Sequence, residues 1–256
     1  YFAVGNYYIM QKQTSLFVVV LLLLVEHSFS QNSDSTKKVA HFGGTITATQ
    51  NGISLIPSFS LGKPAVMFDL NAGNKRLTFE PFLRFGTNGK PWSFIFCWRY
   101  KIITGEKFKL SIGAHPSFVF RTTAATINGT ATNIIQANRY AAGDLTPTYF
   151  FSKNISAGVY YLYSHGLDKT SVQNTHFLTL NSNFSNIKIA GKVFVRFNPQ
   201  VYYLKQDRKD GFYFTYGLTI NRKNFPLSLQ TIMNKAIRTS IPGRNFVWNA
   251  SIIYTF

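Results

Sequence analysis

Apolar and polar residues alternate with a period of two along most of the chain beyond residue 40. The pattern is clearest in the last segment, 245–256, where every second residue is apolar: Phe246, Trp248, Ala250, Ile252, Tyr254 and Phe256. Successive side chains of a β-strand point to opposite faces of the sheet. This alternation therefore predicts a strand with one apolar and one polar face, and segment 92–103 repeats it from Trp92 to Ile102.

Segments with this pattern predict about twelve strands, within a range of about ten to fourteen. They span residues 52–61, 64–71, 76–86, 92–103, 107–121, 139–151, 154–165, 174–184, 188–204, 211–222, 225–237 and 245–256. Residues 42–50 have three possible interpretations. In the first they form a further strand, joined through Asn51-Gly52 as a tight hairpin turn. In the second they are part of a longer first strand, and in the third they are part of a periplasmic lead.

The composition indicates that the apolar faces do not face water. Only 14% of the residues are charged and 16% are aromatic, whereas soluble domains average about 25% charged residues. Beyond the N-terminal leader, no stretch is apolar over the roughly 18 residues that a membrane-spanning helix requires. In lipid every backbone N–H and C=O needs an internal partner, so a spanning sheet must close into a barrel. A soluble β-sandwich would alternate in the same way, but the aromatic apolar face and the charged opposite face favour the membrane.

We therefore predict an all-β fold, a transmembrane antiparallel up-and-down β-barrel. Short connections alternate with mostly longer ones, as in outer-membrane barrels with short periplasmic turns, and an even number of strands places both termini in the periplasm. The longest connection, residues 122–138, is rich in Thr, Ala and Asn and is expected to be a mobile loop. Short turns are expected at 72–75, 104–106, 152–153, 185–187 and 223–224, and a short connection at 62–63 breaks the alternation.

The N-terminal region has the features of a secretory signal. Lys12 supplies a positive charge, Leu16 to Val25 form an apolar run, and Ser28 and Ser30 place small residues before a cleavage site. The alternative is an uncleaved N-terminal anchor. The expected organisation is residues 1–30 as upstream residues and cleavable signal peptide, 31–41 as a periplasmic lead, and 42–256 as the barrel.

The end of the chain resembles the insertion signal of bacterial outer-membrane β-barrels. Trp248, Ile252, Tyr254 and the terminal Phe256 carry this resemblance. It implies an outer-membrane location and recognition by the barrel assembly machinery through strand addition. Segments Ile53–Ala65 and Gly89–Lys101 are similar to uncharacterised outer-membrane proteins of Bacteroidota. The resemblance brings no catalytic or ligand-binding residues.

The chain has a formal net charge of +18, and its strands are expected to turn most of their charged residues inward. Buried charges must be paired or hydrated, so a lumen with more cations than carboxylates is expected to hold water, phosphate or another anion. The residues expected to line it are the basic Arg84, Arg99, Lys101, Lys109, Arg121, Lys188, Lys192 and Arg196 and the acidic Asp69, Glu80 and Asp144.

Two functions fit such a barrel. The favoured hypothesis is a narrow passive channel for small, preferably anionic solutes. The alternative is a barrel filled by side chains, with a structural or binding role that anchors loops, lipopolysaccharide or a partner protein. The expected surroundings are outer-membrane lipid and lipopolysaccharide. The dispersed Lys and Arg residues argue against a nucleic-acid partner.

A lipid hydrolase is a minor alternative, and we predict that the chain is not an enzyme. His115 and Ser117 lie on one face of a strand, as a base and a nucleophile would, and the segment is similar to the His-x-Ser-Asn arrangement of outer-membrane lipid hydrolases. Phe118 stands where that family has Asn, and the pair is expected to point into the lumen. The single cysteine and the histidine spacing predict neither a disulfide nor a metal site, and no cofactor is expected.

Overall fold

The computed structural model describes residues 41–54, 56–127 and 129–256. The predicted signal peptide, and all but the last residue of the predicted periplasmic lead, lie outside these ranges. Within them, no helix is long and apolar enough to cross a membrane. All the described elements belong to one compact unit, Val39–Phe256.

The unit consists of twelve strands and one short 3₁₀ helix, η2, at Pro57–Phe59. The strands are β1 (His41–Thr49), β2 (Ala65–Gly73), β3 (Leu77–Gly86), β4 (Pro91–Thr104), β5 (Phe108–Ile127), β6 (Thr130–Phe150), β7 (Ile155–Gly166), β8 (Asn174–Ala190), β9 (Val193–Gln206), β10 (Lys209–Arg222), β11 (Leu227–Thr239) and β12 (Phe246–Thr255).

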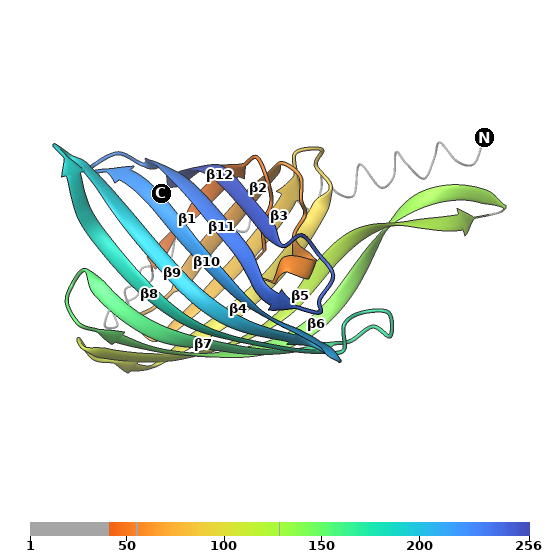
Figure 1. Cartoon of the computed structure of the whole chain (residues 1–256), viewed down its shortest axis with the longest axis horizontal. Helices are drawn as coiled ribbons and strands as arrows, with labels where there is room; N and C mark the ends of the chain where they lie inside the picture. Colours follow the sequence, from red (N-terminus) through yellow and green to blue (C-terminus); the bar gives the residue numbers. More distant parts are fainter. Residues whose placement is uncertain (1–40, 55, 128) are drawn as a thin grey trace, which may run out of the picture. The chain divides into compact units, whose positions relative to one another are not determined.

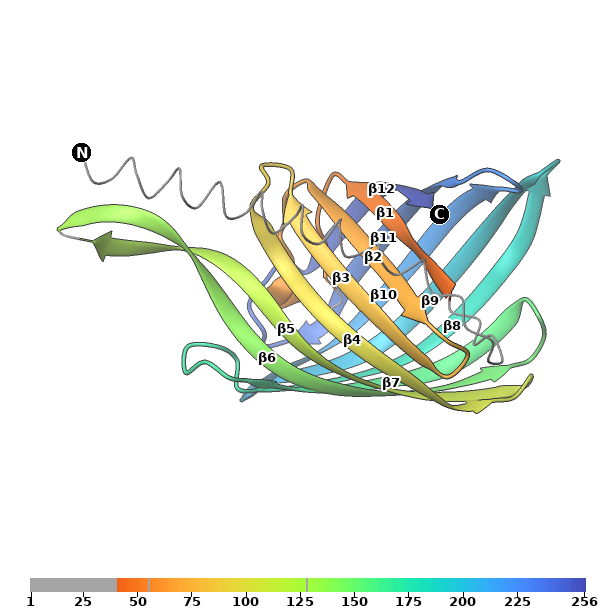
Figure 2. The same ribbon diagram turned by 180° about the vertical axis from the view of Figure 1, so that it is seen from behind.

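The strands form a closed antiparallel barrel in which each strand pairs with its neighbours in sequence (Figures 1 and 2). β1 closes the ring by pairing with β12, from Thr45 opposite Thr255 to Thr49 opposite Ser251. Closure gives the backbone groups of both edge strands partners inside the sheet, as a lipid environment requires. The prediction of an up-and-down barrel of twelve antiparallel strands is confirmed.

The barrel has two unlike ends. We call one the turn end, because it holds the connections 74–76, 105–107, 151–154, 191–192 and 223–226, and β1 begins and β12 ends there. The other, the loop end, holds the connections 50–64, 87–90, 128–129, 167–173, 207–208 and 240–245.

The first strand was predicted wrongly. Residues 42–50 provide it, as β1, whereas residues 52–61, the expected first strand, belong to the connection 50–64. Two prolines, Pro57 and Pro64, lack the N–H that a β-ladder needs. Backbone groups of the segment instead form hydrogen bonds with one another. The short connection expected at 62–63 therefore does not exist. The exceptions to the alternation are instead the two-residue connections 128–129 and 207–208 at the loop end, the second of which replaces a longer one expected at 205–210.

Residues 122–138 are not a mobile loop but the extended ends of β5 and β6. Their pairing runs from Phe120 opposite Ala137 to Ile127 opposite Thr130, and the two-stranded ribbon projects beyond the barrel wall in Figures 1 and 2. Threonine favours extended backbone. Gly129, at φ +78°, supplies the left-handed residue that a tight hairpin needs.

The boundary between β8 and β9 also differs from the prediction. The turn lies at 191–192, not at 185–187, so the expected strand 188–204 is divided between β8 and β9. The ladder register shifts between Phe184 and Ile187, and Asn186 has φ +54°. Asn186 adopts the left-handed backbone without ending the strand, which is how a β-bulge mimics a turn in sequence.

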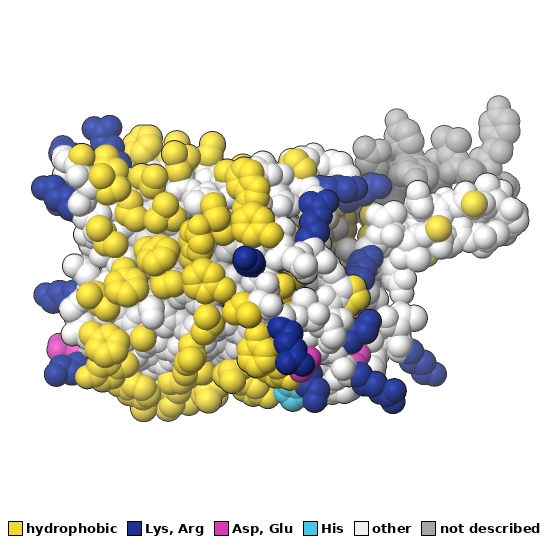
Figure 3. All heavy atoms as spheres, viewed as in Figure 1, with side chains coloured by type: hydrophobic (Ala, Val, Ile, Leu, Met, Phe, Trp, Pro, Cys, Tyr) yellow, Lys and Arg dark blue, Asp and Glu magenta, His cyan; other side chains and the backbone are white. Residues whose placement is uncertain are grey.

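The outer surface carries an apolar belt between two basic ends (Figure 3). On β4, Trp98, Tyr100 and Ile102 are 47%, 41% and 41% exposed. The four residues of the predicted insertion signal, Trp248, Ile252, Tyr254 and Phe256, also lie among the exposed large hydrophobic residues. An apolar surface of this extent marks a membrane or protein contact rather than a surface in water.

Candidate functional site

The connection 50–64, which we call the lumen loop, folds into the interior of the barrel. Its neck is closed by Gly52, whose N–H donates to Lys63 O at 2.8 Å and whose carbonyl accepts from Leu61 N at 2.9 Å. A Cβ on Gly52 would lie 3.0 Å from the Trp92 ring and 3.1 Å from the Leu61 Cβ atom. A side chain at position 52 would therefore require Trp92 and Leu61 to shift by a few tenths of an ångström.

Phe59 anchors the tip of the lumen loop to the wall on one side. Its carbonyl oxygen accepts a 2.7 Å hydrogen bond from Trp92 Nε1 on β4. Its ring lies 5.4 Å from the ring of Tyr140 on β6, measured between centroids. Trp92 and Tyr140 are themselves buried, so this side of the loop is held by a packed wall.

Ser58 anchors the same tip to both sides of the barrel. Its carbonyl oxygen accepts a 2.9 Å hydrogen bond from Arg121 Nη2 on β5, and its Oγ donates at 2.9 Å to Gln206 Oε1 on β9. β5 and β9 are four places apart in the ring of strands. The lumen loop therefore bridges walls that are not neighbours and crosses the interior.

A small hydrophobic core, which we call the lumen core, fills the interior beside the loop. Inward aromatic rings of adjacent strands contact one another: Tyr213 stacks on Tyr202 with 4.8 Å between centroids, and Tyr202 lies tilted against Phe177 at 5.0 Å. Ile56 of the lumen loop packs against this cluster. Its buried members are Leu162, Phe177, Tyr202, Leu204, Tyr213 and Ile241.

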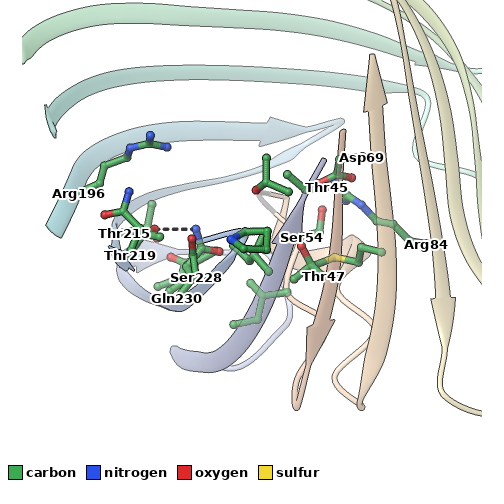
Figure 4. A pocket seen from close by; sticks show the side chains of 18 of the residues that line it. Thr45, Thr47, Ser54, Asp69, Arg84, Arg196, Thr215, Thr219, Ser228 and Gln230 are labelled. Atoms are coloured by element: carbon green, nitrogen blue, oxygen red, sulfur yellow. Dashed lines mark hydrogen bonds between the residues drawn. The ribbon is translucent and has the colours of Figure 1, made fainter. Parts of the chain in front are cut away.

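The described residues line three cavities in the interior. The turn-side cavity, of about 570 Å³, lies between Arg196 on β9 and Asp69 and Arg84 on β2 and β3 (Figure 4). The middle cavity, of about 250 Å³, is enclosed mainly by inward residues of β3 to β8. The loop-side cavity, of about 730 Å³, lies between the lumen loop, the 87–90 connection and the end of β5.

The cavities follow one another past the lumen loop. Ser54 and Arg84 line both the turn-side and the middle cavity. Phe59 and Val119 line both the middle and the loop-side cavity. Each pair therefore lies between two neighbouring cavities.

Arg99 forms ion pairs with two of the three predicted lumen carboxylates. Its Nε lies 3.0 Å from Glu80 Oε2 and its Nη1 lies 2.7 Å from Asp144 Oδ1. The side chain of Asp144 is only 1% exposed, and its Oδ2 lies 4.0 Å from His115 Nε2. Gly113 stands directly opposite Asp144 in the ladder, where a Cβ would collide with the carboxylate.

The remaining predicted carboxylate, Asp69, lies near Arg84 without a direct ion pair. Asp69 Oδ1 and Arg84 Nε are buried, and neither has a hydrogen-bond partner in the described part of the chain. The Arg84 guanidinium lies 5.5 Å from the centre of the Trp92 ring and 6.0 Å from that of Phe82. Arg84 is thus held over aromatic rings between the turn-side and middle cavities.

The predicted lumen cations divide into two groups. Arg84, Arg99, Arg121 and Arg196 line the three cavities. The four lysines lie toward the turn end and line none of the three: Lys101, Lys109, Lys188 and Lys192. Lys109 lies over the Phe150 ring at 4.6 Å, and Lys192 is in the turn itself.

The sequence reasoning missed three cavity cations. Lys63 and Lys90 line the loop-side cavity, and Arg222 lines the turn-side cavity. Lys63 and Lys90 belong to connections, where a two-residue period assigns no face. Arg222 is the last residue of β10, where the inward and outward alternation ends.

The geometry does not assemble the predicted base and nucleophile. His115 and Ser117 both line the middle cavity, so they face the lumen rather than lipid. No hydrogen bond joins these two residues, both of which the structure describes, and the nearby acid of His115 is Asp144. The lumen therefore provides charged groups, apolar walls and cavities, and the residues of the expected hydrolase pair are not hydrogen-bonded to each other.

Comparison with known proteins supports the fold. No family model matches the chain, and no curated protein matches its sequence. A solved KdgM porin aligns over 84% of this chain and 99% of its own, with 8% identity and a TM-score of 0.52. The KdgM porin in complex with disordered oligogalacturonate aligns over 85% and 99%, with 9% identity and a TM-score of 0.50. The chain thus has the closed antiparallel fold of outer-membrane β-barrels.

Proposed function

We propose that the protein is an outer-membrane channel for small, preferably anionic solutes, with both termini in the periplasm and the passage narrowed by the lumen loop. The observation that carries this proposal is the set of three cavities beside the lumen loop, whose linings hold more cations than carboxylates. Secretion through the predicted signal peptide, a Bacteroidota origin and insertion through the C-terminal strand stay predictions that fit this function.

Charge along the route supports a preference for anions. Arg99 uses two of the three predicted lumen carboxylates, which leaves only Asp69 for the other seven predicted cations. Lys63, Lys90 and Arg121 line the loop-side cavity, and none of the described residues around that cavity is Asp or Glu. A narrow passage with surplus positive charge concentrates anions and repels cations.

One of the similar barrels gives independent support. It is a porin that was solved with oligogalacturonate, a carboxylate-bearing oligosaccharide. At 9% identity this comparison supports only the suitability of the fold for anion passage. The residues that would act in this chain are its own.

Planar-bilayer recording tests the proposal. We expect the refolded protein to form channels whose reversal potential in a KCl gradient has the sign of chloride preference. Arg84→Gln combined with Arg196→Gln should reduce that preference, because both residues line the route. Lys153→Gln combined with Lys223→Gln removes the same charge from two turns and should leave it unchanged. A folded protein without conductance, or one that prefers potassium, contradicts the proposal.

A structural or binding barrel is the second candidate, and the lumen core favours it. Six buried side chains and the lumen loop fill part of the interior, as expected of a barrel closed by its own residues. Such a barrel would present its exposed belt and basic ends to outer-membrane lipid, lipopolysaccharide or a partner protein. A folded protein that never conducts and co-purifies with a partner would support this candidate.

A further inference from the structure

We infer that the turn end of the barrel binds anionic phospholipids, such as phosphatidylglycerol, in the membrane leaflet around it. The inference goes beyond the proposed channel function and holds equally for a barrel that does not conduct. It follows from three features of this end: the number of cations in its turns, the way neighbouring turns bring cations together, and the exposed apolar side chains beside them.

Each of the five connections at the turn end contains at least one cation. Their sixteen residues include six cations and one acidic residue, Glu106. The connections of the loop end have five cations and two acidic residues among 36 residues. Lys and Arg side chains are visible at the turn end of the barrel in Figure 3. The six cations, which we call the turn cations, are Lys75, Arg76, Lys107, Lys153, Lys192 and Lys223.

The turn cations are not neutralised by carboxylates of the described residues. All six are exposed, and none forms an ion pair with another described residue. The nearby parts of the strands add Lys101, Lys109, Lys188 and Arg222. The described acidic residues outside the loop end are Asp69, Glu80, Glu106 and Asp144. Glu80 and Asp144 are already bound to Arg99. The turn end therefore keeps a positive excess even when the lumen carboxylates are counted.

Hydrogen bonds between neighbouring segments place like charges side by side at this end. Lys223 N donates to Lys192 O at 2.9 Å, and Lys101 N donates to Arg76 O at 2.8 Å. Each bond makes two cationic residues direct neighbours across the sheet, where like charges destabilise the pairing. A phosphate between the two side chains would replace this repulsion by attraction, because lysine and arginine both bind phosphate oxygens well.

Exposed apolar side chains indicate that the turn cations lie at the edge of the membrane-facing belt. Phe151 is 66% exposed, lies 5.1 Å from the Tyr149 ring between centroids, and stands two residues before Lys153. Aromatic residues are enriched at the headgroup level of a bilayer, where lysine keeps its stem on apolar surface and its charge in water. Each of the five connections has such an exposed apolar residue within two positions: Leu77, Phe108, Phe151, Ile189 and Phe225.

These features together favour lipid phosphate over other anions. A lipid whose acyl chains cover the apolar belt brings its phosphate to the height of the turn cations. An acidic soluble protein would match the charge but would not cover side chains that face acyl chains. Each Lys or Arg near an anionic membrane surface strengthens binding about fivefold. In the proposed orientation, with both termini in the periplasm, the leaflet concerned is the periplasmic one.

Native mass spectrometry of the refolded protein tests the inference, with phosphatidylglycerol and phosphatidylcholine of identical acyl chains as probes. We expect phosphatidylglycerol to bind at least about fivefold more tightly. The turn variant, which loses one cation from each connection, should bind the two lipids within about twofold of each other. Its substitutions are Arg76→Gln, Lys107→Gln, Lys153→Gln, Lys192→Gln and Lys223→Gln.

A loop variant is the matched control, because it removes the same charge from exposed residues at the other end of the barrel. It should keep the preference for phosphatidylglycerol. None of its five positions lines any of the three cavities. Its substitutions are Lys169→Gln, Lys205→Gln, Arg208→Gln, Lys209→Gln and Arg244→Gln.

Equal binding of the two lipids by the wild type, or an equal loss of preference in both variants, would overturn the inference. Glycerol phosphate that binds as tightly as phosphatidylglycerol would overturn it in favour of a soluble phosphate. Binding of a polyglutamate peptide without any lipid preference would overturn it in favour of an acidic protein. Lys192→Gln with Lys223→Gln, compared with Lys205→Gln with Lys209→Gln, retains the test if the larger variants do not fold. Chloride current without a lipid preference removes this inference alone, whereas absence of current contradicts only the proposed function.

Discussion

The indole Nε1 of Trp92 donates a 2.7 Å hydrogen bond to the carbonyl oxygen of Phe59. Trp92 belongs to the barrel wall and is only 2% exposed, whereas Phe59 belongs to η2 at the tip of the lumen loop. Both residues line the loop-side cavity. The width of the proposed channel at this end should therefore depend on the attachment of the loop to the wall.

Trp92→Phe should loosen the lumen loop and widen the passage. The substitution removes the donor and leaves the Phe59 carbonyl without it, at a cost of about 1–3 kcal/mol. We expect lower stability in urea titration of the lipid-embedded protein and a higher single-channel conductance. Trp98→Phe is the control, because Trp98 is on the outer face; an equal conductance change in both variants would contradict the role of Trp92.

Asp144→Asn should destabilise the barrel more than Glu80→Gln. Both carboxylates pair with Arg99, but the Asp144 side chain is 1% exposed and that of Glu80 is 21% exposed. Removing one partner of a buried ion pair costs about 3–5 kcal/mol, whereas a partly exposed pair contributes about 0–1 kcal/mol. Chemical unfolding of the two variants measures the difference, and equal losses would contradict the buried role of Asp144.

Gly113→Ala should disrupt the same ionic cluster from the opposite strand. An added Cβ would collide with the Asp144 carboxylate, and overpacking of this kind costs about 1–3 kcal/mol. Gly143→Ala is the matched control, because the nearest atom to its added Cβ is 3.6 Å away. We expect Gly143→Ala to leave the unfolding midpoint unchanged; a loss equal to that of Gly113→Ala would refute the steric argument.

The loop 167–173 should detach from the barrel in acid. Hydrogen bonds from the side chain and backbone N–H of Arg139 hold the pKa of Asp168 below its usual value. A carboxyl group with a lowered pKa stabilises the folded state above its unfolded pKa of about 3.9. That contribution disappears as the pH falls through the lowered pKa. The protection factors of the amides in 167–173, which correct for the intrinsic pH dependence of exchange, should fall at pH below about 4, and Arg139→Gln should remove most of this change.

The aromatic residues of the lumen core show what strand parity, the alternation of inward and outward positions along a strand, can predict. Tyr160, Phe177, Tyr202 and Tyr213 all occupy inward positions of their strands. Parity could therefore have placed these rings in the lumen. It could not predict that Ile56 would cover them, because a two-residue period carries no information on which loop turns inward.

The charged residues of the lumen show the same difference between what strand parity predicts and what it leaves open. Strand parity places Arg99, Asp144 and Glu80 on the inner face of three different strands. Their pairing depends on the stagger between β3, β4 and β6, which brings residues 80, 99 and 144 to the same height. Only the closed sheet sets that stagger, so the surplus of cations could be predicted from sequence and their partners could not.

The sequence by itself determined the antiparallel barrel, a strand number within ten to fourteen and the apolar exterior. It did so because a period of two with aromatic residues on one face is compatible with few surroundings other than lipid. The path of residues 50–64 was decided by the tertiary structure. An alternating apolar segment can be buried equally well by lipid outside a strand or by side chains inside a lumen. Its contacts with Trp92, Arg121 and Gln206, distant in sequence, selected the lumen.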